Sequence, residues 1–392
     1  MHFNFVVDRM LHGRAYPALT LWSAEPYTTE WYQFGQHWPY SVPPHLYDFC
    51  LSQNIPHSFH TIDSFPPDSF YTIGLQFFDF SIDYFGLVRP EVLTHVKNNR
   101  LRILFFYDEG DNPHLIKKRL DELCAYNNLS SDCYIFISAN TAASMIPSFA
   151  YLLSDELLYW QQNRSVNATA IHTNTRSREF TVLSRTNKLW RATVMTDLKR
   201  QGLLDNSYWS YNTNISLNET SDENSLNIVS QILQSDIENF LNQGPYTCDD
   251  FSSDQHNNHS LTNHMHFFDS YCSIILETHF DADNSNGTFL TEKTFKAIKH
   301  GHPFIIVGCV GSLAELRNQG YRTFDHVIDN RYDLETDSVQ RWIKIVRAIR
   351  QIQQHNMHDW FLQCINDVRH NQQIFLRSKQ NRLQNLYRKL ND

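Results

Sequence analysis

Short apolar runs alternate with amphipathic stretches along most of the chain, a pattern typical of an α/β protein. The apolar runs over 101–107 and 133–140 predict buried strands. The stretch 112–127 between them predicts a helix, with Asn112 at the cap and Pro113 at the first helical position. Together these elements form a βαβ unit, which implies a parallel sheet.

A second series of the same kind occupies the later half of the chain. The segment 189–202 predicts a helix ended by Gly202, and 226–244 predicts another. Ser312 and Glu315 have the spacing of a capping box at the start of a helix that Gly320 closes. Apolar runs predict strands at 180–185, 271–277 and 302–308.

The polar stretch 160–179 separates the two series, and we expect a domain boundary there. The sequence thus predicts an N-terminal domain over 1–165 and a C-terminal domain over 176–392, both Rossmann-like and facing a cleft. Apolar residues at spacings of three and four predict further helices over 338–392. Residues 1–70 are rich in aromatics, His and Pro without clean periodicity, and we assign no element there.

Composition and charge narrow the function classes. With 392 residues, 41% of them hydrophobic and 19% charged, the chain is long enough for two globular domains. Its net charge of -9 opposes nonspecific attraction to nucleic acid over the whole surface. The segment 338–392 carries more Lys and Arg than Asp and Glu. A solvated helix face explains this excess, and a local contact with nucleic acid or a membrane surface is the alternative.

Cysteine usage and hydropathy bear on the compartment. The seven cysteines include no C-x-x-C pair, so we interpret them as reduced, mostly buried thiols. The first residues lack the apolar core of a secretory signal, and no stretch approaches the roughly 18 apolar residues of a membrane span. We expect a cytoplasmic protein.

Glu292 and Lys293 form the most informative local pattern. Thr291 can cap a short helix, so both residues fall in its first turn, beside a loop that follows a predicted strand. Such loops bind ligands in open parallel sheets. A carboxylate can accept hydrogen bonds from ribose hydroxyls while an ammonium neutralises a phosphate, which together would bind a nucleoside diphosphate. The alternative is that Glu292 only stabilises the helix dipole and Lys293 is surface.

Two segments of the second half resemble the donor-binding domain of α1,3-fucosyltransferases and related GT-B glycosyltransferases. One is a strand ending in Glu, a gap, an aromatic-x-Thr-Glu-Lys, a helix and a Pro-initiated strand ending in Gly. The other, 180–205, is a strand, a Ser-containing turn and an Arg-bearing helix. The first segment's matching residues are Glu277, Phe289, Thr291, Glu292, Lys293, Pro303 and Gly308.

The resemblance implies a glycosyltransferase that moves a sugar from a nucleotide-sugar donor to a hydroxyl of a glycan or other acceptor. It implies no metal or other cofactor and inversion at the anomeric carbon. Arg191, with Arg185 and Lys188 nearby, would meet the donor phosphates, and Glu277 and Thr291 would complete the donor site. The family places its general base in the other domain. There Asp108, Glu109 and Asp111 follow a predicted strand, with Glu109 the preferred base and a polar turn the alternative.

Other motifs lead to weaker hypotheses. Asp281-x-Asp283 is the D-x-D pattern that GT-A enzymes use to bind a metal. The same stretch is also close to the pattern of a calcium-binding loop, but its glycine is one position too late. We therefore prefer a solvated loop. The cluster of His256, His259, His264 and His266 lacks ligand spacing.

Two alternative functions stay open. One is a glycosyltransferase acting on a modified DNA base, with the basic C-terminal helices on the DNA backbone. The other is a nucleotide-sugar-binding or interaction protein without turnover.

Overall fold

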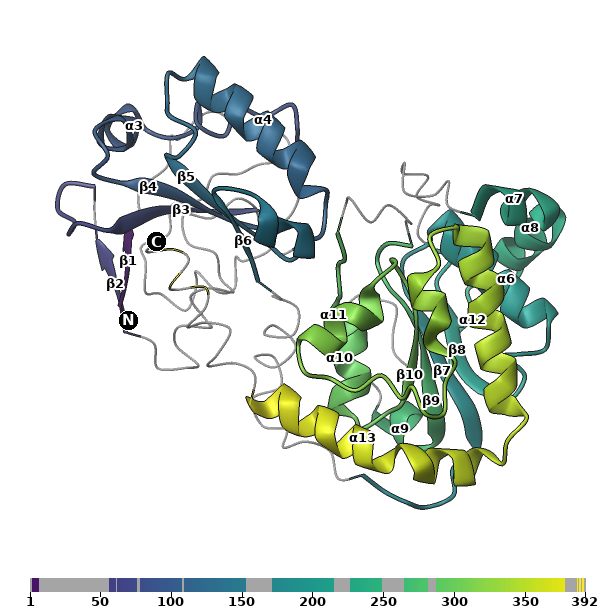
Figure 1. The fold of residues 1–392 in the computed structure, drawn as a ribbon. Coiled ribbons are helices and arrows are strands. Elements are labelled where there is room, and N and C mark those ends of the chain that lie inside the picture. The colour runs from purple at the N-terminus through teal and green to yellow at the C-terminus, as the bar shows by residue number, and fades with distance from the viewer. Residues whose placement is uncertain are drawn as a thin grey trace. The chain divides into compact units, whose positions relative to one another are not determined.

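The computed structural model describes residues 2–6, 56–60, 62–75, 78–107, 109–152, 171–214, 226–248, 264–280 and 287–377, with Leu386, Arg388 and Leu390. The chain divides into two compact units. Unit 1 comprises residues 1–161, 285–287 and 379–392, and unit 2 comprises 162–284 and 288–378. Each unit is built on a parallel sheet, so the α/β class predicted from the sequence is confirmed (Figure 1).

Unit 1 contains a six-stranded sheet in the order β2-β1-β3-β4-β5-β6, with every neighbouring pair parallel. Helices α3 and α4 lie on one face of this sheet (Figure 1). The strands are β1 (Phe3–Val6), β2 (His57–His60), β3 (Ser69–Leu75), β4 (Arg102–Tyr107), β5 (Tyr134–Ser138) and β6 (Phe149–Tyr151); the helices are α3 (Pro90–Lys97), α4 (Pro113–Tyr126) and the 3₁₀ helix η1 (Thr141–Met145).

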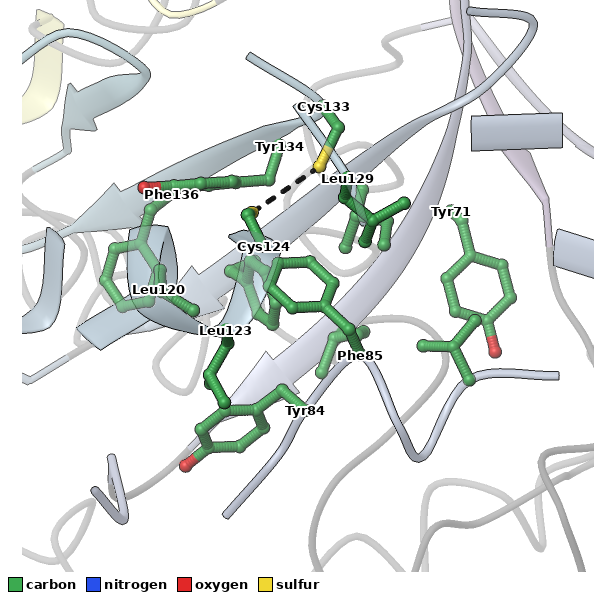
Figure 2. Packing of buried hydrophobic residues seen from close by; sticks show 14 of the residues in the cluster. Tyr71, Tyr84, Phe85, Leu120, Leu123, Cys124, Leu129, Cys133, Tyr134 and Phe136 are labelled. Atoms are coloured by element: carbon green, nitrogen blue, oxygen red, sulfur yellow. Dashed lines mark hydrogen bonds between the residues drawn. The ribbon is translucent and has the colours of Figure 1, made fainter. Parts of the chain in front are cut away.

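The core on the helical face of unit 1 is aromatic (Figure 2). Phe136 of β5 stacks on Phe149 of β6 at 4.9 Å between ring centroids, and Leu120 of α4 is fully buried in the same cluster. Cys124 and Cys133 lie in this core with their sulfurs 3.8 Å apart. The contact with Cys133, reinforced by burial, raises the pKa of the Cys124 thiol. The described cysteines are all free thiols, as predicted.

The other face of the first sheet is covered by chain from the far end of the sequence. Successive residues of β4 alternate between the two cores, with Phe105 in the helical one and Leu104 in the other. Leu386 and Leu390 pack against that second core, and the Arg102 guanidinium donates to the Leu390 carbonyl at 2.5 Å. The prediction that all of 176–392 belongs to one domain is therefore wrong for 379–392.

Unit 2 contains a four-stranded parallel sheet in the order β10-β9-β7-β8. The chain begins at β7, adds β8 on one side, and then crosses to add β9 on the other. The strands are β7 (Arg178–Ser184), β8 (Ser207–Tyr211), β9 (Ser270–Leu276) and β10 (Phe304–Val307). The helices around them are α6 (Leu189–Arg200), α7 (Asn227–Ile232), α8 (Gln234–Gln243), α9 (His264–Phe268), α10 (Glu292–Lys299), α11 (Ser312–Asn318), η4 (Asn330–Leu334), α12 (Ser338–Gln353) and α13 (Met357–Arg377).

Most predicted helix boundaries hold, but the helix predicted over 226–244 divides at Leu233 into α7 and α8, and one cap differs. Asn112 caps α4 by accepting from the His114 amide at 2.9 Å, and Gly320 follows α11 with a φ of 90°. The Ser312 capping box does not form. Instead the Asp333 carboxylate accepts from the Leu313 and Ala314 amides at 2.9 and 3.0 Å, and Gly311 is the cap residue. An acid that is distant in sequence thus satisfies two amides of the first turn of α11.

No helix in the described ranges is long and apolar enough to span a membrane.

Buried histidines should make the stability of unit 2 depend on pH. His300 is 3% exposed, and burial lowers its pKa to about 3, with cationic His264 and Lys299 adding to the shift. His302 is completely buried, and its pKa also lies well below the ordinary value. Because the unfolded chain titrates near 6.5, it binds more protons than the folded chain between about pH 6.5 and 3. The free energy of unfolding should therefore fall as pH drops through that window.

Urea unfolding at pH 7.5, 6.5 and 5.5 measures this effect. We expect His300 to contribute a loss of up to ~1.4 kcal/mol per pH unit below 6.5, and His300→Gln to remove that part of the slope. His355→Gln, at an exposed position, is the matched control. Equal stability at the three pH values would contradict the prediction.

Candidate functional site

The candidate site lies where the strand order of unit 2 changes direction. β7 and β9 are adjacent and parallel, yet the chain leaves them toward opposite sides of the sheet. Both end at the same edge, at Ser184 and Leu276. The crevice outside the carboxyl ends of two such strands is the ordinary ligand position in open α/β sheets. The predicted donor-site residues belong to the segments that follow these two strands.

A buried carboxylate lies at the centre of this edge. Glu277 is 0% exposed and immediately follows β9. Its Oε2 accepts from the Thr291 hydroxyl at 2.5 Å, and its Oε1 accepts from the Thr294 hydroxyl at 2.5 Å and the Thr291 amide at 3.3 Å. Thr291 also caps α10, as predicted. Glu277 therefore fixes the start of α10 against the end of β9.

Two cations of the β7–α6 connection bind the same strand end through its backbone. A terminal nitrogen of Arg191 donates to the Glu277 carbonyl at 2.5 Å, and Lys188 Nζ donates to the Thr278 carbonyl at 3.1 Å. Arg191 is 1% exposed. Burial lowers the pKa of Arg191, and the negative charge of Glu277 opposes that shift. Arg191 and Glu277, both predicted to belong to the donor site, are thus almost completely buried.

Glu292 and Lys293 form the accessible part of the site. Their side chains are 18% and 25% exposed, and Lys293 Nζ lies 3.4 Å from Glu292 Oε1. Lys293 Nζ also donates to the Thr291 hydroxyl at 2.9 Å. Burial lowers the pKa of Arg185, and the negative charge of Glu292 opposes that shift. Arg185 on the β7–α6 connection and Glu292 on α10 therefore interact electrostatically.

The N-terminus of α6 has the features of an anion site. Its cap residue is Lys188, and within the described part of the chain no side chain caps the helix. Its first turn carries no acid. The Ser184 hydroxyl, just before this turn, is buried and finds no hydrogen-bond partner among the described residues. Unsatisfied amides at a helix N-terminus bind anions, and phosphate is a common ligand.

The charges around this edge do not cancel. The site residues described above include four cations and two anions. The cations are Arg185, Lys188, Arg191 and Lys293, and the anions are Glu277 and Glu292. Two positive charges thus remain in a partly buried environment, where screening by solvent is weak. An anion of about two negative charges, such as a diphosphate ester, would neutralise them.

The candidate base residues lie in unit 1. Glu109 and Asp111 follow β4 at the carboxyl edge of the first sheet, and both are partly buried. The Tyr107 phenol donates a short hydrogen bond to Asp111. Asp108 lies outside the described residues.

The histidine and D-x-D motifs have separate outcomes. His266 is buried on α9, stacks on Tyr208 at 4.7 Å, and places Nε2 3.2 Å from the Cys248 carbonyl, which is a structural role. In the ranges that the structure describes, no three His, Cys, Asp or Glu residues are placed to hold a metal ion. Asp281, Asp283, His256 and His259 lie outside those ranges.

Two site residues were missed from the sequence. Thr294 lies three positions after the cap residue Thr291, so both hydroxyls face the end of β9. This spacing could have been recognised in the sequence. Thr278, whose hydroxyl lies 3.5 Å from Lys293 Nζ, had no such signal.

Comparison with known proteins adds little to this geometry. No protein-family model and no curated protein matches the chain. A solved structure of a mutant of T4 phage BGT in complex with UDP-glucose is similar over 100% of this chain and 99% of that chain, with 8% sequence identity and a TM-score of 0.37.

Removing one hydrogen bond to Glu277 tests the structural role of this carboxylate. Thr294→Val keeps the shape but leaves a buried carboxylate with one donor fewer, and should lower the free energy of unfolding by about 1.5–3 kcal/mol. Thr94→Val in α3, whose hydroxyl donates to a backbone carbonyl at an exposed position, is the matched control. We expect less than about 0.5 kcal/mol there. Urea unfolding of the two variants gives the comparison, and equal losses would contradict the assigned role.

Proposed function

We propose that the protein is a glycosyltransferase that binds a nucleotide-sugar donor at the carboxyl edge of unit 2. The observation that carries the proposal is the pairing of two helix N-termini at one strand-order reversal. One is the uncapped start of α6, with Arg185, and the other is the start of α10, with Glu292 and Lys293. A nucleoside diphosphate presents the matching groups, since its phosphates are anionic and its ribose offers two hydroxyl donors.

Each residue then has a role. Lys293, Arg185 and the α6 amides would bind the diphosphate, and Glu292 would accept from the ribose hydroxyls. As the glycosidic bond breaks, the diphosphate leaving group gains negative charge, which these cations and the buried charge of Arg191 stabilise. With four cationic side chains at the edge, the proposed reaction uses no metal. Glu109 would take the proton from the acceptor hydroxyl, and inversion at the anomeric carbon belongs to the same proposal.

A thermal-shift screen tests the donor site. The native protein is screened against UDP, GDP, CMP and their sugars with EDTA present, so that a metal requirement would appear as an absence of binding. A ligand at 100 times its dissociation constant should stabilise the protein by about 2.7 kcal/mol. We expect one nucleotide class to stabilise the native protein and to lose this effect in the Glu292→Ala, Lys293→Ala variant.

The matched control is a second Glu–Lys pair in the same unit. Glu335 and Lys344 form an ion pair of 2.5 Å and are not among the residues assigned to the diphosphate or the ribose, so Glu335→Ala, Lys344→Ala should keep the full nucleotide shift. If no nucleotide stabilises the native protein, or if both double variants lose the shift equally, the donor site is not where we propose.

A separate variant tests the base. Glu109→Gln should leave donor binding intact and slow release of the free nucleotide from the donor by roughly 10²–10⁴-fold, the usual contribution of a general base. Asp111→Asn should slow it less, because Asp111 is engaged by Tyr107. Nucleotide release from the donor found in the screen provides the measurement, with acceptor mixtures or water as acceptor. Unchanged release in Glu109→Gln would exclude it as the base.

A further inference from the structure

The hydroxyl of Thr291 connects a buried carboxylate to an accessible ammonium. Thr291 Oγ1 lies 2.5 Å from Glu277 Oε2 on one side and 2.9 Å from Lys293 Nζ on the other. Thr291 is 1% exposed, so this connection lies beneath the surface. Through the Thr291 hydroxyl, Glu277 is therefore linked by hydrogen bonds to Lys293, which faces the proposed ligand.

The direction of both hydrogen bonds follows from the chemistry of the three groups. A carboxylate only accepts, an ammonium only donates, and a hydroxyl has one proton to give. Thr291 must therefore donate to Glu277 and accept from Lys293. Because the hydroxyl proton of Thr291 points toward Glu277, a lone pair of the same oxygen points toward Lys293 and accepts a hydrogen bond from its ammonium.

Glu277 itself has little freedom to move. Its amide donates to the Val307 carbonyl of β10 at 3.0 Å, and its Oε1 is held by Thr294 and the Thr291 amide. A Cβ added to Gly308 would lie 3.1 Å from Glu277 Cβ, so even an alanine there would crowd the carboxylate's stem. The acceptor that directs Thr291 is thus fixed by two strands and a helix.

We propose that Glu277 is a positioning residue: without touching the ligand, it orients the Thr291 hydroxyl, which in turn places the Lys293 ammonium for a phosphate. This inference rests on the proposed function, because it assigns Lys293 to the diphosphate. From the sequence, we expected Glu277 to belong to the donor site. In this proposal the carboxylate is buried and acts on the donor only through Thr291 and Lys293.

Glu277→Gln changes the hydrogen-bond direction with little change of shape. The amide replaces one carboxylate oxygen by an NH₂ group, which donates. If that group faces Thr291, the hydroxyl receives donors from both Gln and Lys293, and its own proton loses its acceptor. If it faces Thr294 instead, the remaining oxygen is neutral and a weaker acceptor for Thr291. In either orientation the ammonium is less firmly held.

A double-mutant cycle on nucleotide affinity tests the proposal. The dissociation constant of the nucleoside diphosphate found in the thermal-shift screen is measured by titration calorimetry for the native protein, Glu277→Gln, Lys293→Met and the double variant. We expect Glu277→Gln to weaken binding roughly tenfold in the native background, equivalent to one hydrogen bond to a charged group. In the Lys293→Met background the same change should alter affinity by less than about twofold.

Two outcomes would overturn the proposal. Either Glu277→Gln leaves the affinity of the native protein unchanged, or it weakens binding equally whether or not Lys293 is present. The second result would mean that Glu277 only supports the fold. If the native protein binds no nucleotide, the proposed function itself has failed, which is a different result from native binding with a silent Glu277→Gln.

Variants of Thr291 provide the same test if Glu277→Gln does not fold. Thr291→Ser keeps the hydroxyl and should keep native affinity, whereas Thr291→Val removes it and should weaken binding as much as Glu277→Gln. Because Thr291→Val also removes the cap of α10, the comparison is repeated with Lys293→Met. A loss of affinity that persists there would be an effect of the cap, and would count against the proposal.

Discussion

The arrangement of unit 2 depends on the buried carboxylate of Glu277. A charge without solvent contact is costly unless hydrogen bonds and an opposite charge compensate it. Here the compensation comes from two threonine hydroxyls, one backbone amide and the nearby Arg191 guanidinium. These partners come from the start of α10 and from α6. Satisfying one carboxylate therefore brings together the two helix N-termini that form the candidate site.

The parts of the fold that local sequence could predict are those determined by neighbouring residues. Asn112 and Pro113 start α4, Thr291 starts α10, and Gly320 ends α11, because each effect acts within one turn of helix. Strand β8 was missed because its sequence, Ser207–Tyr211, is polar and aromatic and lacks the apolar run of its neighbours. Asp333 at the start of α11 could not be foreseen, since it acts from a distant position in the chain.

The candidate site was predictable in its residue types and less so in its depth. Glu292 and Lys293 lie side by side in the first turn of α10, as their spacing predicts, and the charge of Glu292 acts on Arg185. Burial of Glu277 and Arg191 depends on how α6, α10 and β10 pack over the strand end, and a linear pattern does not record this. The sequence can therefore suggest a motif residue, but its depth below the surface depends on packing.

The return of the chain to unit 1 has a consequence for how the protein is made. One face of the first sheet, with Phe5 and Leu104, packs against Leu386 and Leu390. A ribosome completes β1 to β6 long before it reaches those leucines, so this apolar face emerges without its cover and stays so while unit 2 is synthesised. Unit 2 can fold during that interval, because its strands are consecutive. Nascent unit 1 is therefore the stage at which this apolar face would need a chaperone.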